Sequence, residues 1–119
     1  MIDKKNFYIN GKWVKPFKQN DFEVINPSNE ESYAVISLGS KEDTDAAVKA
    51  AKEAFIKWKE TSKEERINLL EKLLKIYKTR FNELAEAQSM EMGAPIDYAI
   101  SAQTASGQSH LEDFILRLK

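Results

Sequence analysis

The stretch "YAVISLGSKEDTDAAVKAAKEAFIKW", Tyr33–Trp58, decides the fold class because its residue pattern changes once, at Gly39. Before Gly39 the chain is rich in β-branched and aromatic residues, which is typical of a strand. After it, Ser40 is followed three residues later by an acid, the spacing of a helix capping box. Apolar residues then recur at helical spacing: Ala47, Val48, Ala51, Phe55 and Trp58. The sequence therefore predicts strands over 1–39 and helices over 40–119.

Two further runs in the first part of the chain predict short strands joined as antiparallel hairpins. In "FYINGKWV", Phe7–Val14, Asn10 and Gly11 stand between two apolar triplets. Both central positions of a type I′ turn need positive φ, which Asn and Gly tolerate best. The run "DFEVINP" alternates acidic and apolar residues and should end at Pro27, which has no N–H to donate to a sheet. We expect three or four short strands here.

Three more helices are expected after the first. "SKEERINLLEKLLKIY", Ser62–Tyr77, opens on a second capping-box pattern and carries one apolar stripe. "NELAEAQSME", 82–91, predicts a shorter helix, and a last helix should begin about Pro95 and run toward Lys119. The middle of the last helix, "SAQTASGQS", is small and polar, a composition expected to lie against something large. We expect little within this chain for it to lie against.

Composition excludes several classes of function. The 119 residues carry 18 Lys and Arg against 19 Asp and Glu, a formal net charge of -1. This balance gives no electrostatic reason to expect nucleic acid or an anionic membrane as partner. The absence of cysteine excludes disulfides and a thiol nucleophile within the chain. No apolar run approaches the roughly 18 residues of a membrane helix and no signal peptide is visible, so we expect a cytoplasmic protein.

Neither the single histidine nor the glycines predict a site. Ser109 and Asp113 are near His110 in the sequence, but on a helix Ser109 points away from its neighbour, which favours a surface or packing role for the histidine. The four glycines are scattered, so no glycine-rich phosphate loop is present. The aromatic residues are interpreted as core packing: Phe7, Tyr8, Trp13, Phe55 and Trp58.

Glu91 is the residue that the pattern leaves open. It lies in "QSMEMGAPIDYA", Gln88–Ala99, between two methionines expected to be buried and just before its helix ends. It could be a catalytic base, an ion ligand or a solvated helix end. Backbone carbonyls left free at a helix end, together with one carboxylate, make an oxygen site suited to a monovalent or hard divalent cation.

Five segments appear in an order and spacing that resemble a known family: "YINGKWV", "VINPSNEE", "DTDAAVKAAKEAF", "SKEERINLLEKL" and "EMGAPI". Together they resemble the N-terminal segment of the NAD(P)-dependent aldehyde dehydrogenase superfamily, over about Phe7–Lys119. The resemblance implies an α/β parent fold. This chain would be an N-terminal α+β piece of the cofactor-binding domain, incomplete over 1–119. It would hold short antiparallel strands followed by four helices and lack the Rossmann strands.

The resemblance also implies what the chain lacks. Members of the family are much longer, and their nucleophilic cysteine, glutamate base, oxyanion asparagine, Rossmann strands and oligomerisation hairpin all come later in family order. The parent would oxidise an aldehyde to a carboxylic acid with NAD or NADP through a cysteine thioester. It would be a homodimer or homotetramer. This chain alone would be inactive, with no catalytic and no cofactor-binding residue, and would supply scaffold and tunnel wall.

Family positions can be carried over at four residues. In several members a structural cation, expected here as a monovalent ion, lies near the carbonyl before "NP" and an acid before "xG", which are Ile25 and Glu91 here. Many members have Asp at the second position, where this chain has the longer Glu91. The helix after Pro95 lines the substrate tunnel in related enzymes, which assigns the tunnel wall to Ala102 and Ser106.

A second hypothesis is a self-sufficient small α+β binding or scaffold module, because 119 residues are enough for one core. The two hypotheses differ in surface. A segment of a longer enzyme should leave apolar side chains exposed where the rest would pack, whereas a self-sufficient module should not. An enzyme that used only acids and His110 has no supporting constellation. Whether this chain alone is an enzyme stays open at this point.

Overall fold

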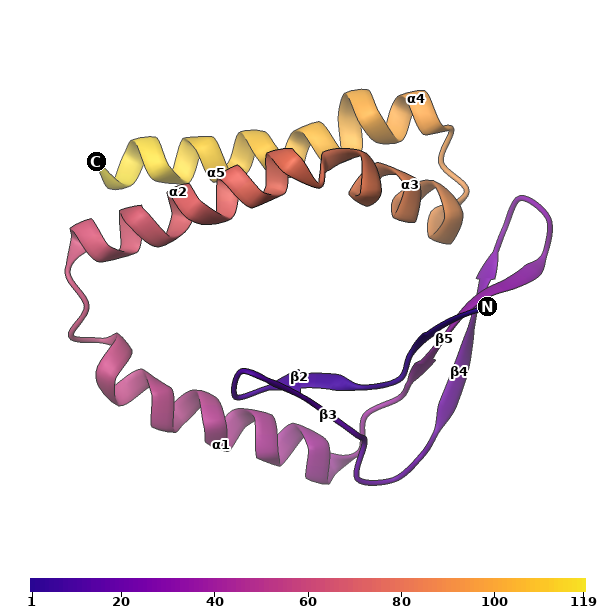
Figure 1. The fold of residues 1–119 in the computed structure, drawn as a ribbon, viewed down its shortest axis with the longest axis horizontal. Helices are drawn as coiled ribbons and strands as arrows, with labels where there is room; N and C mark the ends of the chain where they lie inside the picture. Colours follow the sequence, from indigo (N-terminus) through magenta and orange to yellow (C-terminus); the bar gives the residue numbers. More distant parts are fainter. The chain divides into compact units, whose positions relative to one another are not determined.

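The chain forms two compact units in the computed structural model, which describes all residues from Met1 to Lys119. The first unit is Met1–Glu60 and the second is Thr61–Lys119. All five strands and the first helix belong to the first unit, and the remaining helices make up the second (Figure 1). The boundary between the two units lies after the first helix, whereas the change from strands to helices along the chain occurs earlier, near Gly39. The assignment of 1–119 to one incomplete domain stays a prediction.

The strands of the first unit make two small sheets. They are β1 (Ile2–Lys4), β2 (Phe7–Ile9), β3 (Lys12–Val14), β4 (Asp21–Asn26) and β5 (Glu31–Ser37). β2 and β3 form an antiparallel hairpin, and β5 lies between β1 and β4 in the other sheet. The β4–β5 pair is antiparallel, as the sequence predicted, but β1 pairs parallel with β5 and was not predicted. β1 has one apolar residue in three, and its partner lies far along the chain, so no local pattern marks it.

The turns form where the sequence placed them. Asn10 and Gly11 take φ values of 51° and 75°, which confirms the predicted β2–β3 turn. β4 ends at Asn26, directly before Pro27. The carbonyl of Asn26 then accepts the Glu30 N–H at 2.8 Å, and its side chain accepts the Ser28 N–H at 2.9 Å. Asn26 is therefore buried with its polar atoms in use.

Helix α1 (Lys41–Trp58) begins at the predicted capping box. The Ser40 hydroxyl accepts the Asp43 N–H at 3.3 Å, and the Asp43 carboxylate accepts the Ser40 N–H at 2.8 Å. The second oxygen of the same carboxylate accepts the N–H of Phe17, at 2.8 Å, from the segment before β4. Asp43 is 8% exposed, so it both starts the helix and ties it to the strand region of its own unit.

The second unit is entirely helical. Its elements are α2 (Lys63–Thr79), α3 (Phe81–Met92), α4 (Ile96–Tyr98), the π-helical segment η1 (Ala99–Thr104) and α5 (Ala105–Leu118). The second capping box is confirmed between Ser62 and Glu65. α4, η1 and α5 follow one another without a break and make up the predicted last helix, which lies beside α2 (Figure 1). The π-helical segment within it was not predicted. None of the helices has the length and apolar content needed to cross a bilayer.

Few apolar side chains are buried. The buried ones are Ala34, Ala85, Ala99 and Ile115. The interpretation of the aromatic residues as core is wrong for four of them, since Tyr8, Trp13, Phe55 and Trp58 are exposed. Met90 and Met92 on either side of Glu91 are exposed as well, at 37% and 65%, against the expectation that they are buried. The exposed apolar surface expected of a segment of a longer enzyme is therefore present.

The bonds to Asp43 generate a prediction. The Ser40 N–H, the Phe17 N–H and the Ser40 hydroxyl hold the pKa of Asp43 below its ordinary value. The stability that this carboxylate contributes is therefore full above its unfolded-state pKa of about 3.9, and is lost as the pH falls through the lower folded pKa. We expect Asp43→Asn to lower the urea midpoint at neutral pH, because an amide cannot accept from all three donors.

The measurement is urea unfolding of the wild type and of Asp43→Asn from neutral to acid pH, monitored by tryptophan fluorescence. The difference between them should be constant near neutrality and shrink once the pH falls below about 4. Asp45→Asn is the matched control, because Asp45 makes only an exposed pair with Lys41. A midpoint for Asp43→Asn equal to that of the control would show that the carboxylate does not hold the unit together.

Candidate functional site

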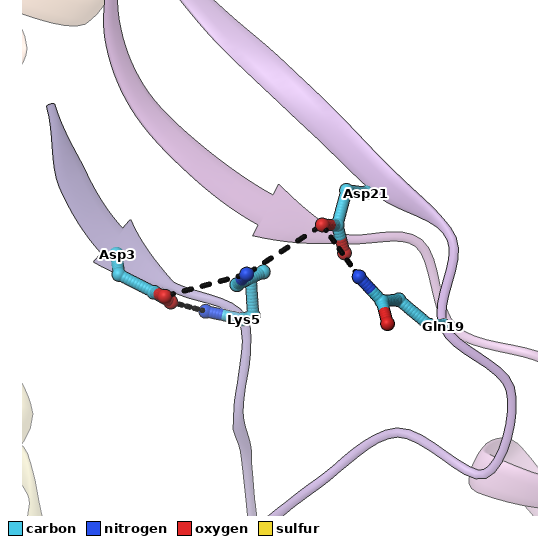
Figure 2. A network of polar contacts seen from close by, with 4 residues as sticks. All are labelled: Asp3, Lys5, Gln19 and Asp21. Atoms are coloured by element: carbon cyan, nitrogen blue, oxygen red, sulfur yellow. Dashed lines mark hydrogen bonds and ion pairs between the residues drawn. The ribbon is translucent and has the colours of Figure 1, made fainter.

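One polar network joins the end of β1 to the start of β4 within the first unit (Figure 2). The Lys5 ammonium lies 3.4 Å from an Asp3 oxygen and 3.5 Å from an Asp21 oxygen. Gln19 donates to the same Asp21 oxygen at 3.0 Å, and the Lys5 N–H donates to Asp3 at 3.1 Å. Both ion-pair distances exceed those of a tight charge-assisted hydrogen bond, and the side chains are partly exposed.

The charges in this network argue against a role for Lys5 as a nucleophile. The Asp21 carboxylate and the Asp3 carboxylate raise the pKa of Lys5 above its ordinary value. A lysine nucleophile must be neutral, so these neighbours hold Lys5 in its unreactive form. Asp3, Lys5 and Asp21 line a surface hollow together with Ser37. The Ser37 hydroxyl is buried and makes no hydrogen bond to another group of the chain. We interpret the network as a tie between two strands.

The two predicted cation ligands lie in different units. Ile25 is on β4, next to a register shift in the β4–β5 pair, and is 44% exposed. Glu91 is exposed in the last turn of α3, and Gly93, which follows the helix directly, has a φ of 70°. No group of three or more histidine or acidic side chains is arranged to hold a metal. A cation site formed by Ile25 and Glu91 stays a prediction.

The two predicted tunnel residues are both in the last helix. Ala102 is half-buried in η1, and Ser106 is exposed at the start of α5. Residues four positions apart lie on neighbouring parts of one helix surface, so both belong to the same side of the helix. A wall built from them would be lined by small side chains, although their role as a wall stays a prediction.

Thr104, the last residue of η1, has the largest fully buried side chain. It is 0% exposed. The Tyr77 hydroxyl, from α2, donates to its carbonyl at 2.8 Å. The Thr104 hydroxyl donates to the Gln88 side-chain oxygen, from α3, at 3.0 Å. The expectation that the middle of the last helix has little to lie against is wrong, because α2 and α3 supply its partners.

Gly107 continues this contact one turn later. A Cβ atom at Gly107 would clash with the Tyr77 hydroxyl oxygen and lie 3.1 Å from the ring carbon that carries it. No side chain fits at that distance unless the ring moves, and the ring is held by its bond to Thr104. The absence of a side chain at position 107 therefore lets α5 approach α2 closely.

The sequence alone predicted neither the polar network at Lys5 nor the contacts at Thr104. Lys5 and Asp21, like Tyr77 and Thr104, are brought together only by the tertiary fold. One signal for the second set was available. The small, polar run 101–109 indicated a close helix contact, and Gly107 within it marked where.

The comparisons with known proteins are decisive about family. The model of the aldehyde dehydrogenase family matches residues 13–115. This chain belongs to the aldehyde dehydrogenase family. Among the curated relatives, a 3-succinoylsemialdehyde-pyridine dehydrogenase of a Pseudomonas species is 42% identical over 111 residues. That alignment covers 92% of this chain and 23% of the relative.

Solved aldehyde dehydrogenase structures share the fold. An aldehyde dehydrogenase of Bartonella henselae matches at a TM-score of 0.98 and 53% identity, over 99% of this chain and 25% of its own. A mutant aldehyde dehydrogenase C of Pseudomonas syringae, in complex with NAD+ and octanal, matches at 0.94 and 37% identity, over 96% and 24%. The chain therefore spans about a quarter of the length of the relatives that it matches. The predicted resemblance to an N-terminal aldehyde dehydrogenase segment is confirmed.

The contact at Gly107 generates a prediction for this aldehyde dehydrogenase segment. Gly107→Ala should force the Tyr77 ring away from Thr104. Overpacking of this kind costs about 1–3 kcal/mol, of which a better helix propensity returns about 1 kcal/mol. We therefore expect a net loss of up to about 2 kcal/mol in the free energy of unfolding, measured by urea titration and circular dichroism.

Gly39→Ala is the matched control, because the nearest atom to its added Cβ would be 3.6 Å away. It should leave stability unchanged within about 0.5 kcal/mol. In a Tyr77→Phe background, where the hydroxyl is gone, Gly107→Ala should cost less than in the wild type. Equal costs in the two backgrounds would contradict the proposed clash.

Proposed function

We propose that this chain is the scaffold part of an enzyme that oxidises an aldehyde to a carboxylic acid with NAD+ or NADP+. The observation that carries the proposal is the family match over 13–115, in relatives about four times as long. Solved neighbours include complexes with NAD+, one of them with octanal also bound. The chain has no cysteine, so the thioester chemistry proposed for the parent needs a nucleophile from outside residues 1–119.

The junction of β5 and α1 does not fit the pyrophosphate of a dinucleotide cofactor. A helix that binds a pyrophosphate directs free N–H groups toward it from a glycine-rich turn. Here β5 leads into α1 through a segment with one glycine, Gly39, and the first turn of α1 carries the acids Glu42 and Asp43. Asp43 uses the Ser40 N–H, and its negative charge would repel a phosphate. We therefore assign no cofactor contact to this chain.

The contribution that we assign to the chain is structural, with one wall of the aldehyde tunnel. Ala102 and Ser106 lie on one side of the last helix, and small side chains there would leave a wide passage. We propose the carbonyl of Ile25 and the carboxylate of Glu91 as ligands of a monovalent cation, on the strength of the family positions. The parent is proposed to be a cytoplasmic homodimer or homotetramer.

The alternative of a self-sufficient binding or scaffold module is less well supported. A stable small domain buries most of its large apolar side chains, whereas here the aromatic residues Trp13, Phe55 and Phe114 are 69%, 59% and 63% exposed. Exposed apolar side chains occur in both units. The proposed scaffold role explains them as surface covered by the rest of a longer enzyme.

The first test separates the two functions. We expect the purified 119-residue chain to bind a hydrophobic dye and to show no oxidation of octanal with NAD+ or NADP+. The full-length polypeptide that carries this segment should be dye-silent and should reduce the nicotinamide cofactor, followed by absorbance. A dye-silent, monomeric 119-residue chain would instead favour the self-sufficient module.

The second test addresses the cation. Any ion that binds only the folded state raises the melting temperature with its concentration. We expect KCl or NaCl to raise the melting temperature of the full-length protein relative to choline chloride at equal ionic strength. Glu91→Gln should reduce that rise, while Glu86→Gln, an exposed acid of the same helix, should retain it. An identical rise in both variants would remove Glu91 from the proposed site.

A further inference from the structure

The middle of the last helix has little apolar packing to fix its rotation about its own axis. Between Ala102 and Gly107 the side chains are small or polar. A helix packed through large apolar residues is held by their interdigitation, but alanine, serine and glycine offer few such contacts. Between Ala99 and Ile115, which are buried on the same helix, the bonds to Thr104 and the contact at Gly107 are the specific interactions that hold this stretch.

Anchoring Thr104 determines where two other residues point. Ala102 precedes it by two positions and Ser106 follows it by two, which is about half a helical turn in either direction. Thr104 faces α2 and α3 and is 0% exposed. Ala102 and Ser106 therefore lie on the side of the helix away from Thr104, where Ser106 is exposed and Ala102 is half-buried. Rotation of the helix about its axis would move both of them together.

We propose that Tyr77 and Gln88 are positioning residues for the aldehyde-tunnel wall. They hold the carbonyl and the hydroxyl of Thr104, and through it they set how far Ala102 and Ser106 reach into the tunnel. This inference rests on the proposed function, since it takes Ala102 and Ser106 as the wall. It adds that aldehyde selectivity depends on two polar side chains that do not touch the substrate.

The location of the anchor at the end of η1 supports this role. A π-helical turn closes its hydrogen bonds over five residues instead of four, and such turns are often found at functional sites. Tyr77 supplies a donor from α2 to the carbonyl at the end of this turn, and Gln88 accepts from the side chain of the same residue. Tyr77, Gln88 and Thr104 all belong to the second unit, so this set of contacts needs no residue of the first unit.

The experiment uses the full-length enzyme with NAD+ and compares octanal with propanal. Tyr77→Phe removes the hydroxyl that holds the Thr104 carbonyl and keeps the ring. We expect the ratio of kcat/KM for the two aldehydes to change about fivefold, with kcat for propanal within about twofold of the wild type. Thr104→Val removes the hydroxyl that Gln88 binds and should change the ratio similarly. Thr104→Ser keeps that hydroxyl and should retain the wild-type ratio.

Tyr8→Phe is the matched control, because the Tyr8 ring is 63% exposed in the other unit and packs beside Trp13. It should leave the ratio unchanged. Hydrogen exchange of the amides of residues 103–108 gives a readout that does not depend on activity. Tyr77→Phe should speed exchange there, which shows that the anchor has been loosened.

Ala102→Phe separates the inference from the function on which it rests. If Ala102→Phe and Tyr77→Phe both change the aldehyde ratio, the inference stands. If Ala102→Phe changes the ratio and Tyr77→Phe speeds exchange but leaves the ratio at the wild-type value, the anchor is structural only and the inference is overturned. If Ala102→Phe itself leaves the ratio unchanged, the proposed wall is wrong and the inference is overturned with it.

Discussion

The main physical constraint on the structure is that the chain has more large apolar side chains than its small core buries. Three alanines and Ile115 are buried, while both tryptophans, which lie in the first unit, and phenylalanines of both units are exposed. Hydrophobic burial scales with the apolar area removed from water, so this chain obtains only part of the stabilisation that its composition offers. The remainder is available to whatever covers these surfaces, which agrees with a segment that spans about a quarter of its relatives.

Because the core is small, polar contacts determine much of the local geometry. In the first unit, the carboxylate of Asp43 accepts from the start of α1 and from the segment before β4. In the second, Thr104 connects three helices through one carbonyl and one hydroxyl. Hydrogen bonds are directional, whereas apolar contact is not, so each of these residues fixes an orientation as well as a distance.

Sequence patterns predicted the elements whose causes are local. Both capping boxes, the Asn10–Gly11 turn and the strand end at Pro27 follow from residues within a few positions of one another. The parallel pairing of β1 with β5 depends on a distant partner, and nothing in its three residues indicates it. Burial was overestimated at Tyr8 and Trp13, because periodicity identifies an apolar face but does not show what covers it.

The candidate site divides in the same way. Ala102 and Ser106 were proposed as tunnel residues from a family resemblance. The structure supports this proposal only in that both residues lie on the same side of one helix. The contacts that hold that helix, through Tyr77 and Gln88, are separated from Thr104 by 27 and 16 positions and could not be predicted from local sequence. Family and local pattern thus identified the candidate residues, whereas the tertiary fold revealed their support.

The π-helical segment has a consequence for chain length. Within a regular α-helix, removing one residue rotates everything beyond it by about 100° and turns its buried face outward. Over Ala99–Thr104 the backbone already follows a wider turn than an α-helix requires. Loss of one residue there can be absorbed by tightening the turn, while α5 keeps its face toward α2. This segment is thus the place in the last helix where related proteins can differ by a residue and still conserve the packing that follows.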